Sequence, residues 1–282
     1  MQDYLTFQVD FNAPDMVSTY DELPLWSAMF GLLLLRHMPL KPHLTVLDVG
    51  CGTGFPLFEL AQRLGSTCKV YGIDPWEAAL HRARVKARVW NVHNVDLRQG
   101  TAEAMPFPNG QFDVIVSNLG VNNFSNPEAV LVECWRVAKP SAQLVLTTNL
   151  RGHMTEFYEV FASTLYDLGK QKAVEALESH VEHRATLEGI TALLSRTGFR
   201  VTKVYEEAAS MRFVDGSTFL RHSFIKLGFL DGWRSVVDAG EQEVVFVQLE
   251  ANLNRLAEAR GELTLTIPIA YVEAEKVGRV DT

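Results

Sequence analysis

The chain has 282 residues, of which 47% are hydrophobic, so it can bury a substantial core as one large α/β domain or as a core with an added lobe. Its 26 basic and 34 acidic residues give a net charge of -8, which argues against a grip on a nucleic-acid phosphate backbone. The three cysteines form no Cys-x-x-Cys pair, so neither zinc nor redox chemistry is predicted, and a reducing cytoplasm is expected.

Residues 1–43 precede the first predicted strand and are expected to form an N-terminal helical lid. An apolar helix is predicted over residues 27–36 and ends at Met38-Pro39. Its most apolar run, residues 28–35, is far shorter than the roughly 20 residues that cross a bilayer, and no basic export signal begins the chain. We therefore expect a cytoplasmic protein without a membrane span.

Strands and helices alternate over residues 44–150, which predicts a parallel sheet of the doubly wound α/β class. A strand begins at Leu44, and later strands end at Ile73, close to Val95, at Ser117 and at Thr148, with helices over 57–64, 77–90 and 127–137. Right-handed crossovers bring the carboxyl ends of such strands to one edge, so the residues that follow them should share one cleft.

The pattern changes over residues 151–282. Helices are predicted over 155–167, 171–184, 187–196, 217–230 and 241–258, and strands over 199–204 and 263–272. We expect the helical insertions to form a substrate lid and the last two strands to complete the sheet.

The segment from Val46 to Gly54 is an apolar strand that passes directly into alternating glycines. Glycine lacks a Cβ, so such a loop can adopt positive φ and let its amides approach a ligand. Asp74 ends the second strand at about 20 residues' separation, where an acid meets a ribose in nucleotide-binding folds.

Glycine spacing distinguishes between nucleotide-like cofactors. The third glycine, Gly54, arrives one residue early for the dinucleotide pattern G-x-G-x-x-G. Asp48 at the strand end is a poor neighbour for a pyrophosphate and a good one for an ammonium group, so S-adenosylmethionine fits better.

At this point the sequence resembles the class I S-adenosylmethionine-dependent methyltransferases, especially the small-molecule branch that includes the ubiquinone-pathway enzymes. The resemblance covers roughly residues 40 to 150. Four segments carry it: Asp48 before Gly50, Gly52 and Gly54; residues 99–103 before Met105-Pro106-Phe107; residues 112–118; and Glu133, Arg136-Val137 and Lys139-Pro140. It implies a seven-stranded, mostly parallel sheet, S-adenosylmethionine as cofactor and S-adenosylhomocysteine as product.

The resemblance also implies a set of cofactor contacts. Asp74 should bind the ribose hydroxyls and the glycine loop the methionine portion, while Thr101 stands where the family usually has an acid. The expected contacts are Asp48, Gly50, Cys51, Gly52, Gly54, Asp74, Pro75, Trp76, Thr101, Ala102, Glu103, Asn118 and Tyr20.

Methyl transfer from a sulfonium is an in-line displacement that needs positioning, and it needs a base only if the acceptor must lose a proton. His153 is the candidate base, whereas Thr155 is expected to cap the next helix with Glu156 solvated in its first turn. The expected substrate-pocket residues are Trp26, Asn122, Asn123, Tyr158 and His222, although lid packing or turn formation would equally explain several of them. No metal site is predicted, because His180 and His183 lack the spacing of four used by zinc-binding helices.

The sequence therefore predicts a methyltransferase that acts on a small organic molecule. A nucleic-acid methyltransferase is disfavoured, because residues 118–121 lack the Pro-Pro-aromatic motif expected of enzymes that methylate exocyclic amines. A non-enzymatic binding or scaffold protein is a further alternative, since methyl transfer has no diagnostic nucleophile. The acceptor atom and the oligomeric state stay open at this stage.

Overall fold

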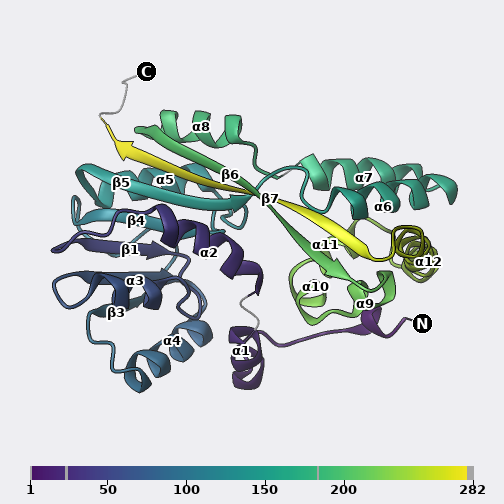
Figure 1. Cartoon of the computed structure of the whole chain (residues 1–282), viewed down its shortest axis with the longest axis horizontal. Coiled ribbons are helices and arrows are strands. Elements are labelled where there is room, and N and C mark those ends of the chain that lie inside the picture. Colours follow the sequence, from purple (N-terminus) through teal and green to yellow (C-terminus); the bar gives the residue numbers. More distant parts are fainter. Residues whose placement is uncertain (1, 23–24, 183, 278–282) are drawn as a thin grey trace. The chain divides into compact units, whose positions relative to one another are not determined.

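The computed structural model describes residues 2–22, 25–182 and 184–277 (Figure 1). The chain forms two compact units. The first, called the sheet unit, contains residues 10–149, 185–207 and those from 269 onward; the second, called the helical unit, contains residues up to Val9, 150–184 and 208–268. The division differs from the predicted one, because both N-terminal helices group with the sheet.

The described residues form a seven-stranded sheet of order β3-β2-β1-β4-β5-β7-β6. Strand β1 pairs in parallel with β2 and β4, β2 with β3, and β4 with β5, whereas β7 runs antiparallel to β5. The strands are β1 (Thr45–Val49), β2 (Lys69–Asp74), β3 (Val95–Gln99), β4 (Phe112–Asn118), β5 (Ala138–Asn149), β6 (Phe199–Phe213) and β7 (Leu263–Lys276). This architecture confirms the predicted doubly wound, mostly parallel α/β class.

Helices cover the sheet within its own unit. Helix α2 packs on β4 and β5, α3 on β2, α4 on β3 and α5 on β5, while α1 packs on α4. Their bounds are α1 (Pro14–Asp21), α2 (Leu25–His37), α3 (Leu57–Leu64), α4 (Glu77–Val89), α5 (Pro127–Val137) and α8 (Leu187–Arg196). Local signals explain the accurate limits of α5, because the Asn126 side chain accepts the Ala129 amide at 3.0 Å and Pro127 occupies the first turn.

The helical unit contains a short 3₁₀ helix (Asp3–Thr6) and most of the remaining helices. These are α6 (Thr155–Asp167), α7 (Gln171–Glu182), α9 (Gly216–Arg221), α10 (Ser223–Gly228), α11 (Leu230–Ser235) and α12 (Gln242–Arg260), with α12 packed on α6 and α9. The single helix predicted over 217–230 is wrong, because the backbone leaves the helical region at His222 and Phe229. Strand β6 extends beyond the predicted residues 199–204, and its later residues are largely exposed without apolar alternation.

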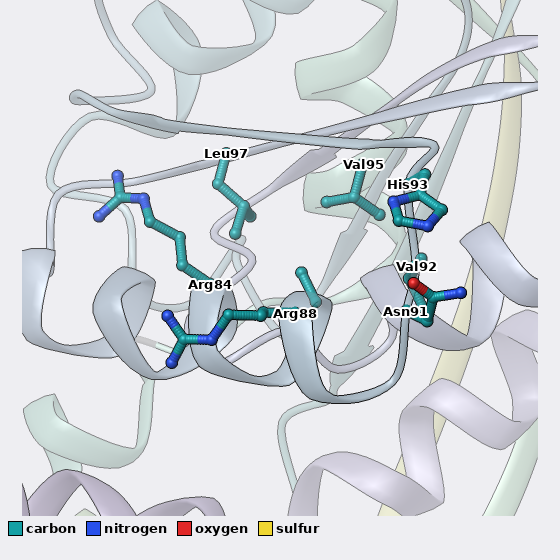
Figure 2. Close-up of a pocket in the computed structure, with 8 residues that line it drawn as sticks. Arg84, Arg88, Asn91, Val92, His93, Val95 and Leu97 are labelled. Atoms are coloured by element: carbon teal, nitrogen blue, oxygen red, sulfur yellow. The ribbon is translucent and has the colours of Figure 1, made fainter.

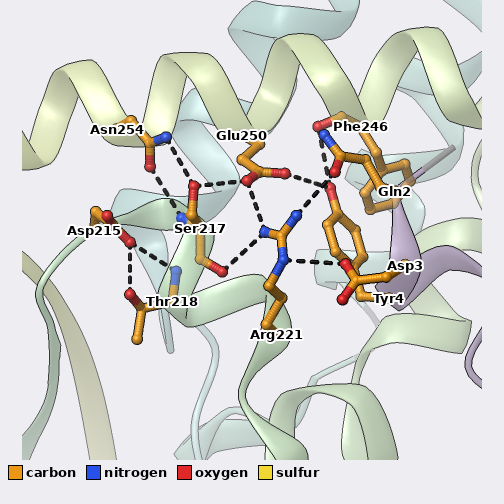
Figure 3. A network of polar contacts seen from close by, with 10 residues as sticks. All are labelled: Gln2, Asp3, Tyr4, Asp215, Ser217, Thr218, Arg221, Phe246, Glu250 and Asn254. Carbon is orange, nitrogen blue, oxygen red and sulfur yellow. Dashed lines mark hydrogen bonds and ion pairs between the residues drawn. The ribbon is translucent and has the colours of Figure 1, made fainter.

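A buried polar network fixes the start of the chain within the helical unit (Figure 3). The Glu250 carboxylate on α12 accepts hydrogen bonds from Tyr4 at 3.1 Å, Ser217 at 2.6 Å and Arg221 at 2.7 Å. Tyr4 is 1% exposed, and the Arg221 guanidinium also pairs with Asp3 at 3.1 Å. Because Glu250 is 8% exposed, its charge is compensated inside the unit by these donors.

None of the helices in the described residues is both long and apolar enough to cross a membrane.

Candidate active site

The loop that joins β1 to α3 follows a backbone path that side chains disfavour. Gly50, Gly52 and Gly54 have φ angles of 78°, 50° and 103°. The Gly50 amide donates to the Ile73 carbonyl at 2.9 Å, which fixes the loop to the end of β2. A Cβ at Gly50 or Gly52 would meet no atom within 4 Å, whereas one at Gly54 would lie 2.3 Å from the Phe58 ring. The first two glycines therefore present open backbone, and the third permits close packing.

Asp74 joins the same loop to the end of β2. Its buried carboxylate accepts the Gly52 amide and the Trp76 amide, each at 2.8 Å. Burial raises the Asp74 pKa, and these two amides partly oppose the shift. Each carboxylate oxygen has two lone pairs, so one acceptor position on each remains for a further donor. Two adjacent hydroxyl groups would satisfy both positions.

Asp48 lies behind the glycine loop. It is 1% exposed, and neither carboxylate oxygen has a hydrogen-bond partner of normal geometry among the described residues. Burial, and then the charge of Asp74, raise its pKa to about 8, with a small opposing effect of the Leu57 amide. The acid is therefore largely protonated at neutral pH. The predicted direct contact between Asp48 and a cofactor ammonium group is corrected accordingly, since its oxygens do not reach the surface of the loop.

Two aromatic rings stand beside Asp74 within the sheet unit. Tyr20 on α1 meets Trp76 edge to face, with ring centroids 5.3 Å apart. The Trp76 indole donates to the Phe11 carbonyl at 3.1 Å. Tyr20 is 38% exposed overall, yet its hydroxyl is desolvated, and burial followed by the Asp74 charge raises its pKa. These rings form an apolar wall next to the carboxylate.

Asp21 is a residue of this region that sequence reasoning missed. Its carboxylate accepts hydrogen bonds from Lys86 at 2.6 Å, from Arg82 at 2.9 Å and from the hydroxyl of Thr53 in the glycine loop. Burial raises the Asp21 pKa, but these donors outweigh burial and leave the pKa below its usual value. They fasten α1 to α4 and to the loop. The only sequence signal was the basic run on α4, which was interpreted as a solvated face.

The remaining predicted cofactor residues are placed less distinctively. They are Cys51, Pro75, Thr101, Ala102 and Glu103. Pro75 and Thr101 are exposed and Glu103 is half-buried, while Ala102 is buried on the segment after β3, whose Gly100 amide donates to the Asp74 carbonyl at 3.2 Å. Cys51 is buried, and burial raises its thiol pKa well above the usual value, so the thiol is inert at neutral pH. Their contacts with a cofactor stay predictions.

Asn118 at the end of β4 uses its amide to connect elements of the fold. Its nitrogen donates to the Ser27 carbonyl on α2 at 3.1 Å, and its oxygen accepts the Thr147 hydroxyl at 2.7 Å. Trp26, next to Ser27, is half-buried and lies 5.2 Å from the Phe30 ring. The predicted cofactor role of Asn118 is therefore accompanied by a clear structural one.

Asn122 connects the end of β5 to the point where the chain returns to the sheet unit. Its amide nitrogen lies 2.7 Å from the Thr148 hydroxyl and 2.9 Å from the Asn149 carbonyl. Its oxygen accepts the Ala185 amide at 3.1 Å. Asn123 is exposed and donates to the Leu119 carbonyl at 2.8 Å, as a turn residue does. The structure thus uses Asn122 as a connector and Asn123 in a turn.

Comparison with known proteins agrees with this geometry. The family described as a methyltransferase domain matches residues 40–209, more than half of the chain. The chain belongs to this methyltransferase-domain family. The class I resemblance seen in the sequence is thereby confirmed, with S-adenosylmethionine as the cofactor that the fold serves.

Individual relatives match a shorter part of this family member. The demethylmenaquinone methyltransferase of Lactococcus lactis is 32% identical over 136 residues, which are 48% of this chain and 52% of that protein. The chain thus spans about half the length of the curated relatives it matches. Among solved structures, the YcgJ protein from Bacillus subtilis has a TM-score of 0.58 at 17% identity and covers 89% of this chain and 99% of its own. A methyltransferase from Aquifex aeolicus has a TM-score of 0.52 at 24% identity, over 70% and 92%. Both similarities concern the fold.

His153 and Tyr158, which belong to the helical unit of this methyltransferase-family chain, are both buried. His153 is 1% exposed in the turn before α6, and burial lowers its pKa to about 3. Tyr158 is 6% exposed and accepts the Trp233 indole N–H at 3.1 Å. A histidine with this pKa is neutral at pH 7 and a weak proton acceptor. The structure therefore supports a hydrogen-bonding role for His153 better than the predicted role as general base.

His222 and Glu156 differ in their degree of attachment. His222 is half-buried against the Phe213 ring, with its Nδ1 unpaired among the described residues and its pKa lowered first by burial and then by Lys226. Glu156 accepts both the amide and the hydroxyl of Thr266, at 2.9 and 2.5 Å. The predicted solvated Glu156 with a Thr155 cap is therefore wrong. The cap position is occupied by Met154 in the left-handed conformation.

Two surface hollows of the sheet unit contain none of the predicted site residues. Figure 2 shows one of about 440 Å³, between α4 and β3. Its walls include Arg84, Arg88, Asn91, Val92, His93, Val95 and Leu97. The other, about 650 Å³, lies at the start of β1 and β2. Across residues 2–22, 25–182 and 184–277, no group of three or more His, Cys, Asp or Glu side chains could hold a metal ion; the predicted His183 lies outside the described residues.

Proposed function

We propose that this chain transfers a methyl group from S-adenosylmethionine to a small organic molecule. The observation that carries the proposal is the joint construction of the open glycine loop and Asp74, in which one carboxylate accepts the Gly52 amide and keeps acceptor capacity for a diol. The geometry is that of a nucleoside site at the carboxyl end of parallel strands.

The residues present fit the cofactor. Gly50 and Gly52 leave space that a Cβ would occupy, so backbone can approach the methionine portion. Asp74 would accept the two ribose hydroxyls, and the Trp76 and Tyr20 rings would flank the nucleoside. Ala102, buried beside the end of β2, would offer its backbone to the adenine.

The protein's contribution to catalysis is positioning. The bound cofactor supplies an already activated methyl group on a sulfonium. Holding an acceptor in line with that group can lower the barrier by up to about 7–11 kcal/mol. A base is required only for an acceptor that must lose a proton, and His153, neutral at pH 7, would instead orient the acceptor through a hydrogen bond.

A small molecule is the proposed acceptor for two reasons. The matched relatives are named demethylmenaquinone methyltransferases, which act on a small organic ring system. The net charge of -8 gives no footprint for nucleic acid, and Asn118-Leu119-Gly120-Val121 lacks the Pro-Pro-aromatic motif of amine-methylating nucleic-acid enzymes.

Calorimetric titration with S-adenosylhomocysteine tests the proposal. The wild-type chain should bind it, and Asp74→Asn should weaken binding about 10- to 100-fold, because one charged acceptor for two hydroxyls is lost. Asp96→Asn is the matched control, since Asp96 on the neighbouring strand pairs with Arg98 at 2.7 Å and should leave affinity unchanged.

The alternative of a scaffold protein predicts binding without turnover. Incubation with S-adenosylmethionine and a fractionated pool of small metabolites should release S-adenosylhomocysteine in the wild type. Binding without release in every fraction would favour the scaffold, and an absence of binding would overturn the proposal entirely.

A further inference from the structure

Three buried polar side chains of the helical unit come from different segments of the chain. His153 precedes α6, Tyr158 lies on α6, and Arg184 follows the end of α7. The Nε2 atom of His153 and the Nε atom of Arg184 are fully buried and have no hydrogen-bond partner among the described residues. Native proteins rarely leave such groups unpaired, since each unsatisfied group costs about 1–3 kcal/mol.

The three side chains form one cluster. The His153 and Tyr158 rings meet edge to face at 5.5 Å. Burial lowers the pKa of His153, and the positive charge of Arg184 and then His180 lower it further. Arg184 also donates a hydrogen bond to the Tyr158 hydroxyl, opposing the rise in pKa that burial causes. Arg184 is therefore close to both rings.

The cluster offers donors and lacks an anion. The Tyr158 oxygen accepts from Trp233 at 3.1 Å and from Arg184, which leaves its own O–H to donate. Among the described residues, no carboxylate contributes to the pKa shift of His153 or of Tyr158. A guanidinium in a desolvated setting requires a counter-charge, and an oxyanion would satisfy the Arg184 Nε–H, the Tyr158 O–H and the His153 imidazole together.

Flat aromatic rings lie alongside these donors. Trp233 is fully buried, and its ring lies 4.1 Å from that of Phe157 and 5.6 Å from that of Phe229, the latter in a stacked arrangement. Phe229 in turn lies 6.2 Å from the His153 ring. An anion that enters beside these rings is best carried by an apolar, planar body.

We propose that Arg184, Tyr158 and His153 bind the carboxylate of an aromatic organic acid, which is the methyl acceptor. The assignment of this ligand as acceptor rests on the proposed methyltransferase function, whereas the binding of an aromatic carboxylate at this cluster does not. The carboxylate would anchor the molecule, and methylation would occur at another atom of it or at the carboxylate itself.

The test compares a charged ligand with its neutral isostere. The wild-type chain, saturated with S-adenosylhomocysteine, is titrated calorimetrically with 2-naphthoate and with 2-naphthamide. We expect 2-naphthoate to bind about 10- to 100-fold more tightly, the range set by a charge-assisted hydrogen bond to arginine. Equal affinities, or no binding of either, would overturn the proposal and would assign the buried donors to internal water.

Variants locate the site. Arg184→Gln should remove the preference for 2-naphthoate, Arg184→Lys should restore part of it, and His153→Gln should weaken it less. Arg212→Gln is the matched control, because Arg212 in the same unit is 68% exposed and paired with Glu262, and it should leave the preference unchanged. If Arg184→Gln fails to fold, the wild-type comparison together with Arg184→Lys still decides.

The same titrations separate the two proposals. Unchanged S-adenosylhomocysteine affinity with no preference for 2-naphthoate would reject the anion site alone. Preference for 2-naphthoate without S-adenosylhomocysteine binding would reject the methyltransferase function and leave the anion site standing.

Discussion

Replacing Asp48 with asparagine should change how the free energy of unfolding depends on pH. The Asp48 pKa is raised from 3.8 to about 8 in the folded chain, chiefly by burial. Between these values the folded state holds a proton that the unfolded chain releases, so stability is greatest at low pH and falls as the pH rises. The loss is about 1.4 kcal/mol per pH unit, or about 2.7 kcal/mol between pH 5 and pH 7.

Asp48→Asn cannot ionise and should remove most of this slope. Asp74, whose pKa is also raised by burial, titrates together with Asp48, so part of the wild-type slope belongs to the pair and remains in the variant. The assay is urea unfolding at pH 5, 6 and 7, followed by tryptophan fluorescence. Asp96→Asn should keep the wild-type slope. An Asp48→Asn variant as pH-dependent as the wild type would refute the claim that Asp48 is buried in its protonated form.

Three further changes test the packing around the site. Gly54→Ala should destabilise the chain by about 1–3 kcal/mol in thermal unfolding, because its Cβ would lie 2.3 Å from the Phe58 ring at a positive φ. Asn122→Ala should cost about 1–3 kcal/mol through its lost hydrogen bonds, while S-adenosylhomocysteine affinity stays near the wild-type value; a selective loss of affinity would contradict the connector role. Tyr4→Phe should cost about 1 kcal/mol in urea unfolding by removing the hydrogen bond to Glu250, and an unchanged midpoint would show that the bond contributes nothing.

Elements with local signals could be predicted from the sequence. Helices α3 and α6 have the predicted bounds, since each amphipathic segment lies between clear turn residues. The glycine loop and Asp74 could likewise be predicted, because their spacing along two neighbouring parallel strands determines that they meet.

Features that depend on distant partners could not be predicted. Asn122 resembles a turn residue in sequence, yet its partners Asn149 and Ala185 lie far along the chain. The side of the loop on which Asp48 lies depends on burial by several elements, and so does its raised pKa. Arg184 carried no motif, and only the fold brings it to His153.

The double attachment of Asn122 has a consequence for how the fold can vary. One side chain grips both the last residue before the 150–184 excursion and the first residue after it. The entropy of closing that excursion is therefore met at its base, whatever the intervening chain does. A different cassette could be spliced between Asn149 and Ala185 while the strands beneath kept their register, which makes this junction a natural point for exchanging one acceptor preference for another.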